Sequence, residues 1–318
     1  MKLLAVFFIV FNLYANDILT EYRLHGLDGI EKKMDYELGD PSYWKKFLKD
    51  KDTSFGYSEV YTNILACNKK DSTLKFYRKD KDRVIQIKKF GAFTGKESGQ
   101  KREEGDLRTP IGVYKLTRKL DKVDQFYGPM AFVTSYPNTF DKYEGRDGHG
   151  IWIHGLPLDN EDRENFTKGC IAIDNKNIMC LNDEIDISKT LLIIDDKEIK
   201  KDISKNVLAN ILANVYQWRY SWLYSKIDDY LAFYDKDFIR FDKMDFKRFK
   251  TFKTIIFNRK EKKSIIFKDI SIVKYPDKKD IYQVTFHEFY HTKRYQFSGN
   301  KTLIIKLKNN KMKIITEK

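Results

Sequence analysis

Two short runs of sequence decide the fold of this chain: HGIWIHG at residues 149–155 and NFTKGCIAI at residues 165–173. In the first run two isoleucines alternate with Trp152 and His154, which is typical of a β-strand that carries both rings on one face. In the second run a glycine leads into Cys170, and an apolar, strand-like stretch follows. The sequence therefore predicts two strands that present a histidine and a cysteine.

This histidine and cysteine indicate nucleophilic chemistry. A thiolate nucleophile needs a base within hydrogen-bond reach, and the base needs a third group to hold its ring. The backbone carbonyl of Gly155, directly after His154, is predicted to be that third group. Because glycine lets the backbone approach closely, N–H groups near Gly169 and Cys170 are expected to point at a developing oxyanion. Judged by spacing alone, two unrelated residues remain the alternative.

The cysteine count supports a special role for Cys170. Three cysteines are too few for a disulfide scaffold, and an odd number leaves at least one thiol free. Cys67 and Cys180 lie in apolar surroundings, so both are expected to be buried small hydrophobes, with a mutual disulfide as the alternative. Cys170 differs from them because a polar residue and a glycine precede it.

The N-terminus has the features of a signal peptide. Met1 and Lys2 precede an apolar run at residues 3–11, which is too short to span a bilayer but suits a signal-peptide core. Cleavage after Ala15 is expected, and retention as an anchor is the alternative because Leu13 is larger than the residue usually found there. No other stretch is long or apolar enough to cross a membrane, so the mature chain is expected in the periplasm or on a cell surface.

Charge divides the chain. The 318 residues carry a net charge of +14, and residues 204–318 alone hold 26 basic against 12 acidic residues, which leaves 34 of each kind elsewhere. In this compartment a basic domain is expected to be drawn to wall glycopeptide or a membrane surface, and no nucleic acid partner is expected. A solvated, lysine-rich surface is the alternative.

Three motifs in order resemble the YkuD, or L,D-transpeptidase catalytic, family. They are a Thr-Pro-x-Gly-x-Tyr segment within residues 105–114, a His-Gly pair within residues 153–155, and Thr-x-Gly-Cys within residues 167–171. The resemblance covers roughly residues 57–196 and implies a mixed β domain. It also implies that Cys170 is the nucleophile, that His154 is the general base, and that the Gly155 carbonyl orients this base.

Two residues depart from that family pattern. Lys168 stands where a histidine is common, and Ala172 where an arginine is common, which puts the acceptor step of a transpeptidase in question. Lys168 could attract a substrate carboxylate and lower the pKa of the thiol, or it could be an exposed loop lysine. With Gly169, three further residues complete the predicted oxyanion and substrate-binding set, namely Thr167, His149 and Trp152, and a plain turn is the alternative for His149.

From residue 204 an amphipathic helical pattern precedes several strand-like runs, which is an α+β order. The helical stripe consists of Val207, Ile211, Val215, Trp218 and Trp222, with Tyr230 after a break, and the strand-like runs lie at residues 264–267, 270–273, 282–286, 303–307 and 312–315. The pattern resembles the NTF2-like domain, with residues 229–238 as its entry from helix to strand. The run at 287–291 reads His-Glu-Phe-Tyr-His and so has the spacing of the HExxH metalloprotease motif. That motif lies on a helix, whereas this run alternates like a strand, so no metal or other cofactor is expected.

The predicted architecture is α+β and multidomain. It consists of a signal peptide at 1–15, a helical segment at 16–56, a YkuD-type catalytic domain at 57–197 and an NTF2-like α+β cone at 204–318. This layout resembles the periplasmic L,D-carboxypeptidases that set helical cell shape in curved Gram-negative bacteria. The resemblance implies that Cys170 forms a thioester while tetrapeptide stems are trimmed to tripeptides at the bond between meso-diaminopimelate and D-alanine.

Two other functions remain as alternatives. One is an L,D-transpeptidase that forms 3-3 cross-links, and the other is a non-catalytic wall-binding protein. The expected substrate is the stem peptide of peptidoglycan, and glycan strands or wall-associated proteins are candidate partners of the basic C-terminal domain. A homodimer through the N-terminal helices is a hypothesis.

Overall fold

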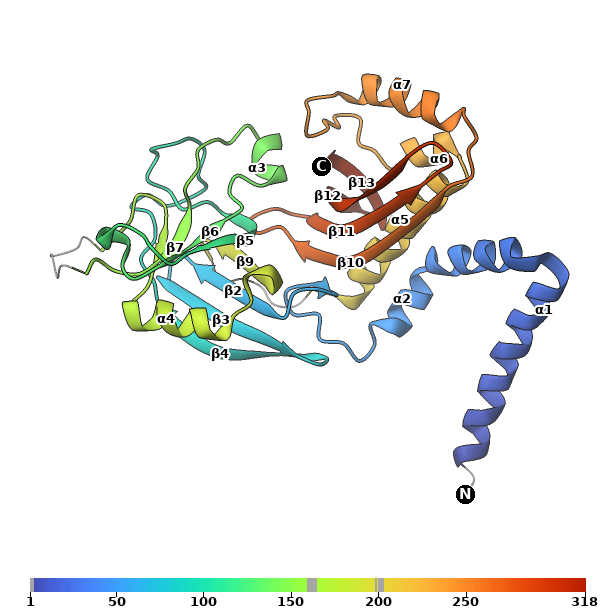
Figure 1. Cartoon of the computed structure of the whole chain (residues 1–318), viewed down its shortest axis with the longest axis horizontal. Helices are drawn as coiled ribbons and strands as arrows, with labels where there is room; N and C mark the ends of the chain where they lie inside the picture. The colour runs from blue at the N-terminus through green and yellow to red at the C-terminus, as the bar shows by residue number, and fades with distance from the viewer. Residues whose placement is uncertain (1–2, 159–164, 198, 200–202) are drawn as a thin grey trace.

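The computed structural model describes residues 3–158, 165–197, 199 and 203–318, with residues 3–16 described by their backbone alone. Two β-sheets with their helices lie side by side, and a helical N-terminal arm projects from the second of them (Figure 1). The first sheet is mixed and the second is antiparallel. The predicted α+β fold class is confirmed.

The first sheet has eight strands in the order β4-β3-β2-β9-β5-β6-β7-β8. The pairs β2–β9 and β7–β8 are parallel. Strand β2 is buried along its whole length, because alternate side chains face two different cores. The strands are β2 (Asn63–Asn68), β3 (Thr73–Asp80), β4 (Arg83–Gly91), β5 (Gly112–Leu120), β6 (Ala131–Thr134), β7 (Trp152–His154), β8 (Ile171–Ala172) and β9 (Thr190–Asp195), and the helices are η1 (Gln125–Tyr127), α3 (Thr139–Tyr143), α4 (Asn175–Glu184) and η2 (Ile187–Lys189).

The second sheet has five strands in the order β1-β10-β11-β12-β13. Helix α5 packs across one face of this sheet, and Trp218 in its C-terminal half is fully buried against Phe267 and Phe286. The predicted helical stripe therefore faces the core. The elements are β1 (Tyr57–Ser58), α5 (Lys205–Leu223), α6 (Ile227–Leu231), α7 (Phe246–Phe257), β10 (Ser264–Lys274), β11 (Ile281–His291), β12 (Gln296–Lys308) and β13 (Lys311–Glu317).

Three details of the second domain differ from the predictions. The two strands expected at 264–267 and 270–273 form the single strand β10, which changes register around Asp269, a residue with a φ of +59°. Helix α7 was not predicted, although Phe249, Lys253 and Phe257 bury one face at helical spacing. Phe238 lies among turns rather than at the start of a strand. The run at 287–291 does lie on a strand, as predicted.

A shared hydrophobic core joins the two domains. It contains Ile64 and Ile193 from the first sheet together with Val273 and Ile304 from the second. At its edge the ring of Tyr275 packs on Phe140 at 4.6 Å, and the Asn138 side chain donates a hydrogen bond to the Tyr275 hydroxyl at 3.1 Å. Because this core is continuous, each domain stabilises the position of the other.

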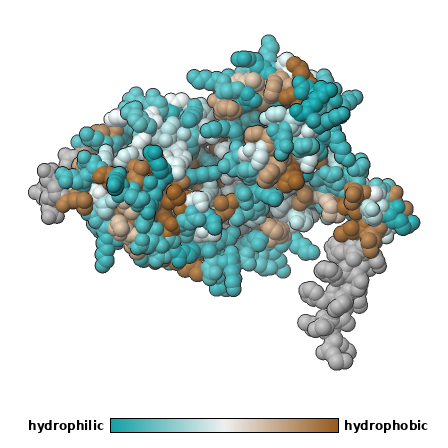
Figure 2. All heavy atoms as spheres, in the orientation of Figure 1, coloured by the Kyte–Doolittle hydropathy of each residue, from teal (hydrophilic) through white to brown (hydrophobic). Residues whose placement is uncertain are grey.

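The N-terminal arm consists of α1 (Leu3–Leu38) and α2 (Pro41–Phe47), with a kink at Gly26. The end of α1 and α2 pack on α5, where Asp35 accepts a 2.6 Å ion-paired hydrogen bond from Arg219. Figure 2 shows hydrophobic residues gathered where α1 bends, next to the segment drawn in grey. No helix in the described part of the chain is long and apolar enough to cross a membrane. Met1 and Lys2 lie outside the described residues, and signal-peptide cleavage stays a prediction.

The three cysteines are free thiols. Cys67 is fully buried on β2, as predicted, and burial raises the pKa of its thiol to about 12. The prediction for Cys180 was wrong, because this residue is only half-buried on α4 and contacts the Lys88 amine. Since α4 rests on the core through Ile178 and Leu181, the intervening Cys180 lies toward the solvent side of the helix.

Candidate active site

The histidine of the candidate site lies on β7, near the edge of the first sheet. Ile153 points into the core and is fully buried, whereas Trp152 and His154 occupy the other face. The ring of Tyr127 packs against both, with centroid distances of 5.1 Å to Trp152 and 5.1 Å to His154. The predicted alternation along this strand is therefore confirmed. His154 is 1% exposed, so packing restricts the motion of its ring.

The backbone around Gly155 fixes the tautomer of His154. The Nδ1 atom lies 2.7 Å from the Gly155 carbonyl oxygen. Because a carbonyl only accepts, Nδ1 carries the hydrogen, and in the neutral ring Nε2 is left as the proton acceptor. No larger residue fits at Gly155, since a Cβ there would approach the Asn175 side chain to 2.3 Å. Its N–H is also engaged, donating to the Tyr127 carbonyl at 3.0 Å.

The cysteine reaches the same region through parallel pairing of β7 with β8. This register sets Ile171 opposite Ile153 and Ala172 opposite His154, so Cys170 precedes the paired segment. Its Sγ accepts a 3.4 Å hydrogen bond from the Trp152 N–H and donates one of 3.4 Å to the Gly150 carbonyl. The side chain is half-buried and remains accessible.

A tight turn presents this cysteine. The Thr167 hydroxyl accepts a hydrogen bond from the Gly169 N–H at 3.0 Å and donates one to the Cys170 carbonyl at 2.7 Å. Gly169 has a φ of +134°, and a Cβ there would lie 2.9 Å from the Arg108 carbonyl oxygen. The Gly169 N–H, which the sequence predicted to point at an oxyanion, is thus committed to Thr167 in this structure. For the Gly169 N–H to donate to an oxyanion, its hydrogen bond to the Thr167 hydroxyl would have to break.

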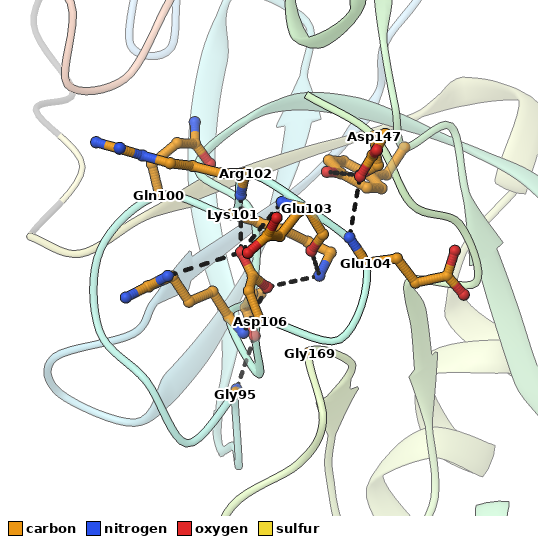
Figure 3. Close-up of polar contacts among 12 residues, drawn as sticks. Gly95, Gln100, Lys101, Arg102, Glu103, Glu104, Asp106, Asp147 and Gly169 are labelled. Carbon is orange, nitrogen blue, oxygen red and sulfur yellow. Dashed lines mark hydrogen bonds and ion pairs between the residues drawn. The ribbon is translucent and has the colours of Figure 1, made fainter. Parts of the chain in front are cut away.

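The loop between Gly95 and Thr109 forms the wall behind this turn (Figure 3). Lys101 and Asp106 form an ion pair at 2.7 Å in which both side chains are almost fully buried. Burial acts to raise the pKa of Asp106, but the Lys101 amine and backbone N–H groups hold it below its ordinary value. The Thr109 hydroxyl accepts from the Gly95 N–H at 2.8 Å. The Thr-Pro-x-Gly-x-Tyr segment thus fixes a loop against the cysteine turn.

The remaining predicted residues lie at the rim. Lys168 is exposed. His149 is also exposed and forms a 3.3 Å contact with Glu104 in the neighbouring loop. Sequence reasoning missed Tyr127, whose pKa is raised mainly by burial. The only local signal was Asp124, which caps the short helix that carries Tyr127.

The second domain contains a cluster of buried charges that was also missed. Lys301 pairs with Glu317 at 3.2 Å, and Glu317 accepts a further hydrogen bond from Tyr234 at 3.1 Å. Burial lowers the pKa of Lys253, which lies beside them, to about 8. Burial also raises the pKa of Glu288. The charged residues of this cluster lie on β11–β13 and α7. In a sequence so rich in lysine, the buried lysines could not be told from the exposed ones.

Together, the mixed sheet and the cysteine turn beside a carbonyl-oriented histidine define a domain of the L,D-transpeptidase type. Comparison with family models agrees, because residues 62–194 match the L,D-transpeptidase catalytic domain and residues 210–318 match the Cds6 C-terminal NTF2-like domain. The predicted NTF2-like fold of the second domain is confirmed.

Similar proteins share the whole arrangement. The crystal structure of the helical cell shape determining protein Pgp2 from Campylobacter jejuni is 39% identical and superposes with a TM-score of 0.82, covering 88% of this chain and 100% of that one. Bd1075 from Bdellovibrio bacteriovorus is 26% identical with a TM-score of 0.66, covering 84% and 96%. The chain belongs to the same family as Pgp2, in which an L,D-transpeptidase catalytic domain precedes a Cds6-type NTF2-like domain.

A curated relative matches the catalytic half alone. YafK of Escherichia coli strain K12, assigned by name to the L,D-transpeptidases, is 29% identical over 123 residues. That match covers 38% of this chain and 45% of YafK, so the chain spans less than half the length of this relative.

Proposed function

We propose that this protein is a peptidoglycan L,D-carboxypeptidase that trims tetrapeptide stems to tripeptides and thereby affects cell shape. The observation that carries the proposal is the hydrogen bond from His154 Nδ1 to the Gly155 carbonyl, beside a strand that presents Cys170. A base held in this tautomer accepts protons at Nε2. Membership of the family that includes Pgp2 supports a role in the cell wall.

In the proposed reaction Nε2 of His154 takes the proton of the Cys170 thiol. The thiolate attacks the carbonyl carbon between meso-diaminopimelate and D-alanine, and the intermediate collapses to a thioester. The leaving D-alanine amine takes the proton from Nε2. Water, deprotonated by the same nitrogen, then attacks the thioester and releases the tripeptide and the thiolate.

Two residues expected near the group that accepts the acyl chain favour hydrolysis over cross-linking. Lys168 and Ala172 replace the histidine and arginine that are common in cross-linking relatives. Ala172 is fully buried and pairs with His154, so its small side chain leaves no basic group at that position. The alternative is an L,D-transpeptidase, which the family name itself supports, with an amine from a second stem in place of water.

The deciding experiment is incubation of the purified protein with disaccharide tetrapeptide and mass spectrometry of the products. We expect disaccharide tripeptide and free D-alanine in equal amounts. Cys170→Ala should abolish D-alanine release while the protein still binds wall material. Formation of 3-3 dimers without tripeptide would contradict the proposal and favour the transpeptidase, and D-alanine release by Cys170→Ala would contradict the assigned nucleophile.

The proposed location is the periplasm, reached with a signal peptide at residues 1–15. Support comes from the short apolar run that follows Lys2. N-terminal sequencing of protein recovered from the periplasm tests it, and a first residue other than Asn16 would contradict cleavage after Ala15.

We also propose that the second domain contacts the wall polymer and that the N-terminal arm joins two copies. The basic excess of residues 204–318 supports polymer contact. The exposed apolar side chains on α1, among them Leu24 and Leu27, support self-association. Light scattering on the protein with and without residues 16–55 tests the dimer. The same number of chains per particle in both samples would contradict it.

A further inference from the structure

One peptide unit lies between the candidate base and the start of α4. Its carbonyl, that of Gly155, accepts the hydrogen bond from His154 Nδ1, and its N–H, that of Leu156, donates to the side-chain oxygen of Asn175 at 2.7 Å. The bond between Gly155 and Leu156 is trans. Because a trans peptide unit is planar, its C=O and N–H point in opposite directions and rotate together. The contact that holds the N–H therefore also sets the direction of the carbonyl.

The sheet does not fix this peptide unit. Strand β7 ends at His154, which is paired with Ala131 on one side and Ala172 on the other, so the peptide unit after Gly155 lies beyond the paired residues. Glycine permits a wide range of backbone angles, and a peptide unit that follows it rotates easily unless another group holds it. The hydrogen bond from Leu156 to α4 supplies that restraint.

Asn175 lies very close to the backbone that it holds. A Cβ added at Gly155 would lie 2.3 Å from the Asn175 side-chain oxygen, and one added at Gly128 would lie 2.6 Å from it. Glycine at these two positions therefore leaves the space that the Asn175 side chain occupies. Since a backbone N–H only donates, the Leu156 contact requires the amide oxygen rather than the amide nitrogen, and it fixes the orientation of this amide.

The segment that carries Asn175 also carries Cys170. It runs from the cysteine turn through β8 into the first turn of α4. Within it Ala172 pairs with His154, and the Ile173 N–H donates to the His154 carbonyl at 3.0 Å. One short segment therefore places the nucleophile and also holds the backbone at the end of β7.

We infer that Asn175 is a positioning residue for the base, an inference that rests on the proposed function. By holding the Leu156 N–H, Asn175 keeps the Gly155 carbonyl directed at Nδ1, so that His154 stays in the tautomer whose Nε2 accepts a proton. The two hydrogen bonds run through a single amide group, and bonds in such a chain strengthen one another. Without the Asn175 oxygen the peptide unit rotates more freely, and the imidazole also populates the other tautomer.

The kinetic test is hydrolysis of disaccharide tetrapeptide by the full-length protein. We expect Asn175→Ala to lower kcat for D-alanine release by about tenfold and to leave KM within about twofold of the parent, because the substrate contacts are unchanged. Asn175→Asp keeps an oxygen acceptor at the same place and should stay within about threefold of the parent in kcat.

The second readout is the tautomer itself, measured by nitrogen-15 NMR of the imidazole rings. Spectra are recorded well above the ordinary histidine pKa of about 6.5, so that neutral rings are compared. The signals of His154 are assigned by their absence from His154→Gln. The parent and Asn175→Asp should carry the hydrogen on Nδ1, whereas Asn175→Ala should show a mixture of both tautomers.

Two further variants separate this role from a general effect on the helix. Asn177, in the same turn of α4, donates to Asp174 at 3.4 Å, so Asn177→Ala removes an amide of the same kind and should match the parent in both measurements. Should Asn175→Ala not fold, Asn175→Ser takes its place and should give the same changes, because its oxygen lies one bond nearer its own backbone.

Three results would overturn the inference. They are the parent's tautomer in Asn175→Ala or its serine substitute, an equal loss in Asn177→Ala, and an Asn175→Asp variant that is no better than Asn175→Ala. A parent that releases no D-alanine would count against the proposed function instead, and the tautomer of His154 would still decide the role of Asn175.

Discussion

At the scale of single residues, Tyr127 is the residue most informative about the base. Its ring contacts His154 edge-on, and such an aromatic pair contributes about 0.5–1.5 kcal/mol. We expect Tyr127→Ala to lower kcat/KM for D-alanine release by about tenfold and to broaden its pH profile, because the imidazole is held less firmly. Tyr127→Phe keeps the ring and should stay within about twofold of the parent. Equal losses in the two variants would show that the hydroxyl, rather than the ring, matters.

Gly169 carries a second prediction at this scale. Its positive φ and the nearby Arg108 carbonyl leave no room for a side chain. We expect Gly169→Ala to destabilise the protein by roughly 1–3 kcal/mol and to displace the thiol, with a matching loss of activity. Urea unfolding measures the first effect. Gly91→Ala is the matched control, because a Cβ there meets nothing within 4 Å, and a similar loss in both variants would contradict the steric reason.

The sequence singled out His154, Gly155 and Cys170, because each expected chemical role demands one residue type within a short stretch. Their roles stay predictions, and the surroundings of these residues were harder to predict. Tyr127 was not found, because its contact with His154 depends on strand pairing between segments far apart in the sequence. Cys180 was misjudged, because apolar neighbours on a helix do not show which way one residue points.

At the scale of elements, the loop behind the cysteine turn depends on the buried pair of Lys101 and Asp106. The folded-state pKa of Asp106 is lowered, so its contribution to stability is complete above the unfolded pKa of about 3.9 and is lost as pH falls through the folded value. We expect Asp106→Asn to be less stable than the parent by about 1–3 kcal/mol at pH 7, with the difference shrinking below pH 4.

Urea unfolding between pH 3 and pH 7 measures this difference. Asp80→Asn, at an exposed position, removes one carboxylate without touching the loop and serves as the control. The difference in the free energy of unfolding between Asp106→Asn and the parent should depend on pH. A constant difference across this range would show that the ionised carboxylate is not its source.

Regular elements were easier to predict than interruptions. The stripe on α5 and the alternation at the end of β11, from His287 to His291, follow directly from burial on one face. The register change at Asp269 interrupts the alternation of β10, so the sequence shows two short strand-like runs. One strand was therefore interpreted as two. Helix α7 was missed because Lys253 occupies a buried position on it, where a pattern based on hydropathy expects an apolar residue.

At the scale of the whole molecule, the shared core should make the two domains unfold together. Tyr275 is 1% exposed and contacts both Phe140 and Asn138 across the domain boundary. We expect one cooperative transition for the parent in calorimetry and two for Tyr275→Ala, because truncation of a buried aromatic ring costs about 3–5 kcal/mol at this junction. Tyr275→Phe keeps the ring and should retain one transition. Two transitions already present in the parent would contradict this coupling.

The pairing of β1 with β10 has a consequence for solubility. Tyr57 and Ser58 precede the strands of the first sheet in sequence but cover the outer edge of the second sheet, opposite Ile272 and Ser271. Farther along, the Ile265 carbonyl at the same edge accepts a 2.7 Å hydrogen bond from Arg219. An uncovered strand edge is a template for pairing with another chain. Deletion of residues 1–58 should therefore give more concentration-dependent turbidity than deletion of residues 1–52, because both chains lack the N-terminal helices and only the second keeps β1. Equal turbidity of the two truncated chains would show that these two residues do not act as a guard against strand addition.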